Sequence, residues 1–266
     1  GGATWKAREI GTKNEDLRSI FGTSDGQRLW AVGGAGAILE SDDGGATWTE
    51  RNSGTNYEDL HSIFGTSDGQ RLWVVGMDGT ILESDDGGAT WTARKSGTKE
   101  WLESIFGTGN GQRLWAVGAG DTILESDDGG ATWAARKSGA GDALNSIFGS
   151  SDGQRLWAVG YEGALVKSED GGATWMARNS GTKKQLHSIF GSSDGQRLWT
   201  VGDEGMIVES DDAGATWTPR NSGTGGDLQS IFGTSDGKRL WASGVKGTIL
   251  ASDDGGATWT ARKAAH

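Results

Sequence analysis

The chain has 266 residues and no cysteine, so it is long enough for one large domain or two and holds no disulfide or thiol nucleophile. Its formal net charge of −11 disfavours nonspecific binding to nucleic acid or to an anionic membrane surface, which needs a basic protein surface. No apolar run approaches the roughly 20 residues of a membrane-spanning helix. Glycine is unusually abundant, but 14 tryptophans indicate extensive apolar burial and argue against disorder. The composition leaves the cellular compartment open.

The sequence is built from internal repeats of 42 or 43 residues. A tryptophan closes the phrase GATW in each repeat, and this phrase also occurs once near the N-terminus. These seven tryptophans are Trp5, Trp48, Trp91, Trp133, Trp175, Trp217 and Trp259. The phrases SIFG and RLW each occur six times. The chain therefore contains six complete units and a surplus N-terminal GATW segment.

Each unit reads as four short strands in chain order. In the second unit we predict strands at Leu60–Phe64, Arg71–Val75, Thr80–Ser84 and Thr90–Arg94, separated by turns rich in glycine and aspartate. Four strands joined by tight turns form an antiparallel meander, and one such sheet cannot bury both of its faces. Radial repetition solves this problem, and a parallel β-helix fits less well because its coils are usually shorter.

We therefore predict an all-β fold, a β-propeller of six four-stranded antiparallel blades plus a surplus N-terminal strand. The blades of this single domain, residues 1–266, are expected at 16–51, 59–94, 102–136, 144–178, 186–220 and 228–262. The segment 1–9 is expected to close the ring within a monomer. Alternatively it is the remnant of a seventh blade, and another chain completes the ring in a strand-exchanged oligomer.

The turn SDDGGATW, which begins at Ser41, resembles the Asp-box, S-x-D-x-G-x-T-W, of bacterial-neuraminidase-type repeats. The longer phrase from Leu72 to Trp91 resembles blades of the photosystem II assembly factor-like propeller family, and the resemblance covers essentially the whole chain. The Ser and Asp of the box can bond backbone N–H groups across the hairpin, and the Gly permits the turn. We interpret the box as a structural clip. It offers too few oxygens for Ca²⁺, so we expect no metal site and no cofactor.

The resemblance to box-bearing sialidases would imply an arginine cluster, a Tyr nucleophile with a Glu partner, and an Asp acid/base. The arginines instead recur at one position in every unit, which favours a repeated structural pairing with acidic residues. They are Arg28, Arg71, Arg113, Arg155, Arg197 and Arg239. No Ser-His-Asp set is evident either. We expect no catalytic residues and no enzymatic activity.

Differences between the units collect in two places, the loop before SIFG and the turn between the second and third strands. In an up-and-down blade both segments emerge on one face. Three aromatic residues that break the repeat register fall there, and aromatic side chains are common binding anchors. Polar residues after the first-strand Leu are candidates to line a central channel. The candidate binding residues are Tyr57, Trp101, Tyr161, His61, His187, Arg18 and Glu103.

The leading hypothesis is a non-catalytic propeller that presents one variable loop face to a protein partner, which fits the assembly-factor resemblance. A lectin that stacks a glycan on the exposed aromatic residues is the first alternative. An engineered or recently amplified repeat scaffold with no selected ligand is the second.

Overall fold

The computed structural model describes residues 16–55 and 58–262, which form two compact units. The described part of the first runs over 16–136 and that of the second over 137–262. The N-terminal segment that we expect to close the ring lies outside the described residues, as does Tyr57. No helix in the described ranges is long and apolar enough to cross a membrane.

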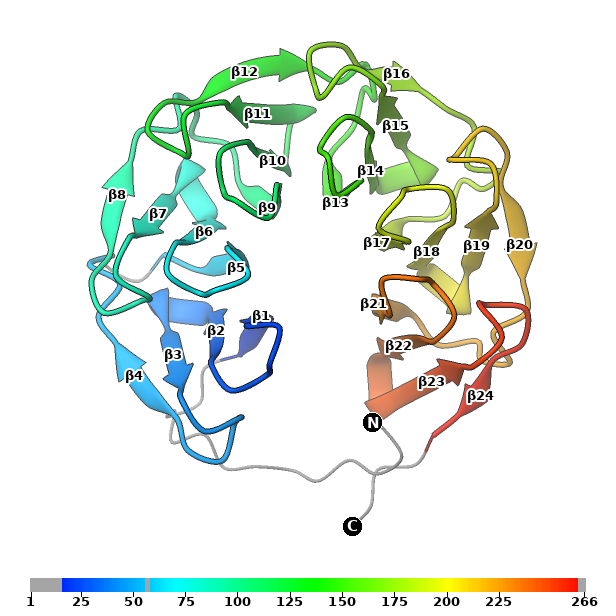
Figure 1. The fold of residues 1–266 in the computed structure, drawn as a ribbon. Helices are drawn as coiled ribbons and strands as arrows, with labels where there is room; N and C mark the ends of the chain where they lie inside the picture. Colours follow the sequence, from blue (N-terminus) through cyan, green and yellow to red (C-terminus); the bar gives the residue numbers. More distant parts are fainter. Residues whose placement is uncertain (1–15, 56–57, 263–266) are drawn as a thin grey trace. The chain divides into compact units, whose positions relative to one another are not determined.

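The first unit contains three antiparallel sheets, each with its four strands in sequence order (Figure 1). Short 3-10 turns η1 (Gly34–Gly36) and η2 (Met77–Gly79) join the second strand to the third in its first two sheets. Its strands are β1 (Leu17–Gly22), β2 (Leu29–Gly33), β3 (Ile38–Ser41), β4 (Thr49–Arg51), β5 (Leu60–Gly65), β6 (Leu72–Gly76), β7 (Ile81–Ser84), β8 (Thr92–Arg94), β9 (Leu102–Gly107), β10 (Leu114–Gly118), β11 (Thr122–Ser126) and β12 (Ala134–Lys137).

The second unit repeats this plan with three more four-stranded sheets. Its 3-10 turns are η3 (Tyr161–Gly163), η4 (Asp203–Gly205) and η5 (Val245–Gly247). Its strands are β13 (Leu144–Gly149), β14 (Leu156–Gly160), β15 (Leu165–Ser168), β16 (Met176–Ala177), β17 (Leu186–Gly191), β18 (Leu198–Gly202), β19 (Ile207–Ser210), β20 (Thr218–Arg220), β21 (Leu228–Gly233), β22 (Leu240–Gly244), β23 (Thr248–Ser252) and β24 (Thr260–Ala261). The described residues thus form six four-stranded blades of an all-β propeller fold, as the repeat predicted. The fourth strands are shorter than predicted, because the first residues assigned to them belong to the box turn.

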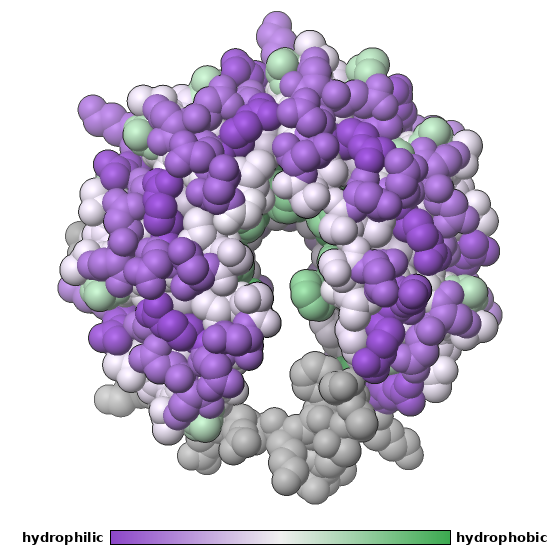
Figure 2. Space-filling view, viewed as in Figure 1, coloured by the Kyte–Doolittle hydropathy of each residue, from purple (hydrophilic) through white to green (hydrophobic). Residues whose placement is uncertain are grey.

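The core lies between neighbouring blades of the same unit, as the need for burial predicted. Trp30 of the first blade packs with Leu60 and Leu72 of the second, and all three side chains are fully buried. The second and third blades repeat this cluster around Trp73, and the second unit has equivalent clusters around Trp157 and Trp199. On the face that Figure 2 shows, hydrophilic side chains cover most of the described surface.

Each Asp-box is a closed set of hydrogen bonds within its own turn. In the second blade Ser84 Oγ donates to Asp86 Oδ1 at 2.8 Å and accepts from Gly88 N at 2.8 Å. Asp86 also accepts from the N–H and the hydroxyl of Thr90, at 2.9 and 2.6 Å. Gly88 has φ +92°, and a Cβ there would lie 2.6 Å from Trp30 Nε1 of the preceding blade, so this position requires glycine. The predicted clip is therefore present.

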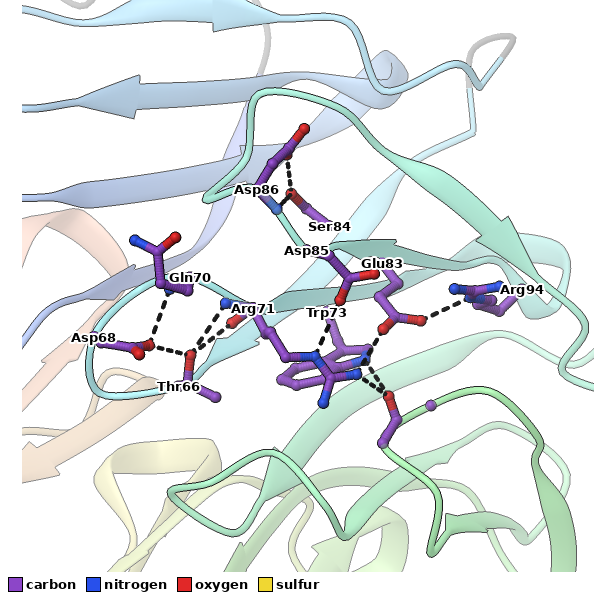
Figure 3. Close-up of polar contacts among 12 residues, drawn as sticks. Thr66, Asp68, Gln70, Arg71, Trp73, Glu83, Ser84, Asp85, Asp86 and Arg94 are labelled. Carbon is purple, nitrogen blue, oxygen red and sulfur yellow. Dashed lines mark hydrogen bonds and ion pairs between the residues drawn. The ribbon is translucent and has the colours of Figure 1, made fainter.

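A second network joins the second blade to the third at the box (Figure 3), and it recurs between the first and second blades. Arg71 Nη2 donates to Glu83 Oε1 at 2.8 Å and to the carbonyl of Gly129, in the next blade's box, at 2.7 Å. Trp73 Nε1 donates to the same carbonyl at 3.2 Å, and the Arg71 guanidinium lies 4.7 Å from the centroid of this indole. Arg94 occupies the other oxygen of Glu83 at 2.7 Å. The repeated arginines thus pair with repeated acids, as the sequence indicated.

The fourth blade departs from this network because Lys167 stands where the first, second, third and fifth blades have a buried glutamate. Its Nζ contacts Glu169 at 2.7 Å. Arg155 donates instead to the carbonyl of Asp194, in a turn of the next blade. Within the described residues no carboxylate pairs with Arg178, although the equivalent Arg94 pairs with Glu83 at 2.7 Å. Glu169 therefore faces three cations, Lys167, Arg178 and Arg155.

We expect Lys167→Glu to raise the free energy of unfolding by about 1–2 kcal/mol, because it restores the buried carboxylate that bridges the two equivalent arginines in the second blade. Chemical denaturation of the variant and the wild type measures the change. Glu209→Lys, which creates the same defect in the fifth blade, is the matched control and should destabilise. An unchanged or lower stability of Lys167→Glu would show that a glutamate between the two arginines does not stabilise this blade.

The box also predicts a pH dependence. Hydrogen bonds, first that from the Thr90 hydroxyl and then that from its N–H, lower the pKa of the Asp86 carboxyl from 3.8 to about 2, and the other five boxes behave alike. A lowered pKa in the folded state contributes stability that is present above about pH 4 and lost as the pH falls towards 2. The melting temperature should therefore fall across this range. Asp86→Asn should lose less on acidification than the wild type, whereas Asp78→Asn, outside the box, should follow the wild type.

Candidate binding surface

The two variable segments of every blade meet at one end of that blade, here called the variable end. The first residue of the second turn donates its N–H to the carbonyl of the residue before the first strand, at 2.8–3.1 Å. The pairs are Gly34–Asp16, Met77–Asp59, Ala119–Trp101, Tyr161–Ala143, Asp203–Gln185 and Val245–Asp227. The near-invariant box and SDG turns lie at the opposite end of the strands. Each blade thus separates repeated structure from variation.

The second turn holds a residue other than glycine in the left-handed region in every described blade. These residues are Ala35, Asp78, Asp121, Glu162, Glu204 and Lys246, with φ between 50° and 62°. Such a conformation costs a residue with a Cβ about 1–2 kcal/mol. Four of the six carry a charged carboxylate and one a lysine, so the variable end displays charge at positions where glycine would be more stable. The sequence patterns did not reveal this.

The polar residue after the first-strand Leu is the extra residue of a β-bulge. In the first blade the pairing passes from Leu17↔Gly33 to Ser19↔Val32, so Arg18 has no partner in the register, and the other blades repeat the shift. Bulges re-aim a side chain locally and recur beside functional sites. The prediction that these residues line a central channel stays a prediction.

The bulged residues that we predicted as ligand-binding contact the variable segments. Arg18 Nη2 pairs with Asp59 Oδ2 of the second blade at 2.7 Å. His187 Nε2 lies 2.8 Å from Asp203 Oδ1, in the second turn of its own blade. The Arg18 and His187 side chains are therefore already engaged in contacts within the protein.

His61 and Glu103 also come together, from neighbouring blades. His61 Nδ1 lies 3.0 Å from Glu103 Oε2, within ion-pair distance, but neither ring nitrogen of His61 has hydrogen-bond geometry to any partner. Trp101 lies edge-on to the His61 ring, with centroids 6.3 Å apart. The structure therefore assembles three of the predicted residues into one corner.

Two predicted aromatic anchors are exposed at the variable ends of their blades. The exposed fraction is 46% for Trp101, just before β9, and also 46% for Tyr161, in η3. Both exceed the exposure expected of tryptophan and tyrosine in a packed interior. Tyr57, the third predicted anchor, lies outside the described residues.

A groove of about 590 Å³ opens at the variable end of the second blade. It lies between the loop at 53–55 and the loop at 96–98, and Trp91 forms part of its wall. Glu58 and Asp78 contribute carboxylates, and Arg94 and Lys95 contribute cations. A groove of this kind has the mixed polar and apolar lining that a peptide or a small ligand requires.

These six Asp-box blades with variable loop ends define a repeat β-propeller. The chain belongs to the family described as photosynthesis system II assembly factor YCF48, whose model matches residues 59–136, 103–183 and 148–221, together more than half of its length. The resemblance inferred from the repeat is thereby confirmed. No curated protein sequence matches the chain significantly.

Solved structures agree with this assignment. "YCF48 bound to D1 peptide" is similar with a TM-score of 0.76 and 25% identity, over 97% of this chain and 84% of that one. YCF48 from Cyanidioschyzon merolae matches with a TM-score of 0.77 and 21% identity, over 98% and 88%. The GH74 enzyme of Niastella koreensis matches with a TM-score of 0.74 and 16% identity, over 96% of this chain but 46% of the enzyme, and this likeness shows the fold alone.

We expect the protein to be stable without a metal ion, because the box carboxylates are already occupied by Ser, Thr and backbone donors. No cluster of three or more His, Cys, Asp or Glu with metal-binding geometry occurs among residues 16–55 and 58–262. Addition of EDTA should leave the melting temperature unchanged, and re-addition of Ca²⁺ should have no effect. A fall of several degrees that Ca²⁺ reverses would show that the box binds calcium.

Proposed function

We propose that this chain is a non-catalytic propeller that binds a segment of a protein partner at the variable ends of its blades. The proposal rests on one observation: within each blade, the residues that differ between repeats lie at the variable end. The box turns are nearly identical throughout, whereas exposed Trp101 and Tyr161 stand at variable ends. The relative solved with a D1 peptide supports a protein ligand for this architecture.

The geometry of the repeated arginines supports a role without catalysis. Arg71 donates to Glu83, to Asp85 at 3.0 Å, and to the Gly129 carbonyl, so its donors are directed at the protein itself. Arg28 has the same partners one blade earlier. An arginine that is committed in this way is poorly placed to receive a substrate carboxylate.

Photo-cross-linking at chosen positions tests the proposal. A benzoylphenylalanine at position 101 or 161 should capture peptides selected from a random displayed library, and the D1 peptide provides a first defined probe. The same group at Gln70 or Gln154, both exposed in near-invariant SDG turns, is the matched control and should capture none.

For a selected peptide we expect Trp101→Ala or Tyr161→Ala to weaken binding by about thirtyfold where that ring is the anchor, which corresponds to about 2 kcal/mol. Isothermal titration measures the loss. Binding that depends on Gln70 or Gln154 instead would place recognition at the end of the blades opposite the variable end. A glycan-array signal that Trp101→Ala abolishes, without any peptide ligand, would favour the lectin alternative, and the absence of every ligand would favour a scaffold.

A further inference from the structure

The corner formed by Trp101, Glu103 and His61 differs from every other variable end in the described chain. Trp101 occupies the position before the first strand where the second and sixth blades have Asp59 and Asp227. Glu103 is the bulged residue of β9. The corner therefore presents an exposed indole and a carboxylate two residues apart.

His61 is buried beneath this corner without a hydrogen-bond partner. Its side chain is 4% exposed, and neither ring nitrogen makes a hydrogen bond. Its ring lies edge-on to Trp101, with an interplanar angle of 81°. A buried polar ring that is left unsatisfied is rare in folded proteins and calls for a reason. Here it lies within ion-pair distance of Glu103 and edge-on to Trp101.

Glu103 lacks a lysine or arginine partner among the described residues. Its ion-pair contact is His61, which carries charge only when protonated. Elsewhere Asp59 pairs with Arg18 and Glu204 pairs with Lys184. Asp203, like Glu103, contacts a histidine, His187. The carboxylate of Glu103 is thus open to a cation from outside the chain.

The surroundings of the corner are acidic. Glu100 lies against the second turn of the third blade, where a Cβ on Gly120 would be 3.3 Å from Glu100 Oε2. In the same turn Asp121 Oδ1 is buried and has no hydrogen-bond partner. Lys99 is the neighbouring cation, and its side chain is exposed. Glu100 and Glu103 flank Trp101 in the sequence, and Asp121 belongs to the turn whose first residue donates to the Trp101 carbonyl. This excess of carboxylates favours a positively charged group and disfavours an anion.

We propose that Trp101 and Glu103 form a receptor for one positively charged side chain, lysine or arginine, of the partner segment, and that His61 holds both residues in place. This inference rests on the proposed function. The cation packs on the indole face and donates to the Glu103 carboxylate, the two interactions by which proteins recognise such groups. A metal ion fits poorly, because a hard cation needs six or more oxygens.

Tripeptide titrations followed by NMR of the tryptophan indole N–H signals test the receptor. The probe is acetyl-Ala-Arg-Ala-amide, and the neutral isostere acetyl-Ala-citrulline-Ala-amide and the acidic acetyl-Ala-Glu-Ala-amide are its controls. The Trp101 signal is assigned from its disappearance in Trp101→Phe. We expect the arginine peptide to shift this signal saturably with a Kd of about 1–10 mM, and the other peptides to bind at least about tenfold more weakly.

The matched variant is Trp101→Ala combined with Glu103→Asn, which copies the Ala143 and Asn145 pair of the fourth blade and therefore suits the fold. In this variant we expect the remaining indole signals to keep their dispersion and to show no shift with the arginine peptide. Glu103→Gln alone should remove the preference for arginine over citrulline but retain weak stacking on Trp101. Equal binding of arginine and citrulline peptides by the wild type, or preference for the acidic peptide, would overturn the receptor.

The outcome is distinguishable from a failure of the proposed function. If a library peptide is captured at position 101 but binds equally well after its lysines and arginines are replaced by glutamine, the variable end binds proteins and the receptor is wrong. If the arginine tripeptide binds with the expected charge dependence while no library peptide is captured, the receptor stands and the peptide-binding function is wrong.

Discussion

The fold of the first unit depends on a box carbonyl oxygen that accepts two donors from the preceding blade, as Gly87 O and Gly129 O do. Gly129 O receives the Trp73 indole N–H at 3.2 Å and the Arg71 guanidinium at 2.7 Å. The indole is fully buried, and the guanidinium stacks over it, so hydrophobic burial, a cation–π contact and a charge-assisted hydrogen bond coincide. Because the box shapes the turn that presents this carbonyl, the clip within one blade and the joint between two blades are a single device.

The exceptions to this device show which parts of it are essential. In the fourth blade Lys167 replaces the glutamate and Arg155 moves to another carbonyl, yet Trp157 still donates to Ala213 O at 3.1 Å. Ala213 has φ 56°, which alanine tolerates at a cost, whereas the next residue, Gly214, would place a Cβ 2.5 Å from Trp157 Nε1. The indole, the carbonyl and the second glycine are retained when the charges change. Ion pairing therefore refines a joint that burial of tryptophan establishes.

The repeat period made the fold predictable, because each phrase recurs with its turn residues and its burial. The pairing of repeated arginines with repeated acids was predictable for the same reason. The corner at Trp101 was only partly predictable from the sequence. The sequence marked Trp101, His61 and Glu103 as departures from the repeat, but it could not show that Glu103 lies against the His61 of the preceding blade. That contact depends on a β-bulge and on packing between blades, and neither leaves a pattern in one strand.

The variable ends also show which hydrogen bond is absent where the Trp101 indole is exposed. Asp59 Oδ1 accepts the N–H of Ala35, and Asp227 Oδ1 accepts that of Glu204, so an aspartate before the first strand ties down the strained turn of the preceding blade. Trp101 stands at this position in the third blade, and an indole cannot accept that bond. Asp78 nonetheless has φ 52° in the turn that lacks this hydrogen bond. Trp101 at this position forgoes a stabilising hydrogen bond and exposes a large apolar ring. Such departures from local folding preferences are expected at recognition sites.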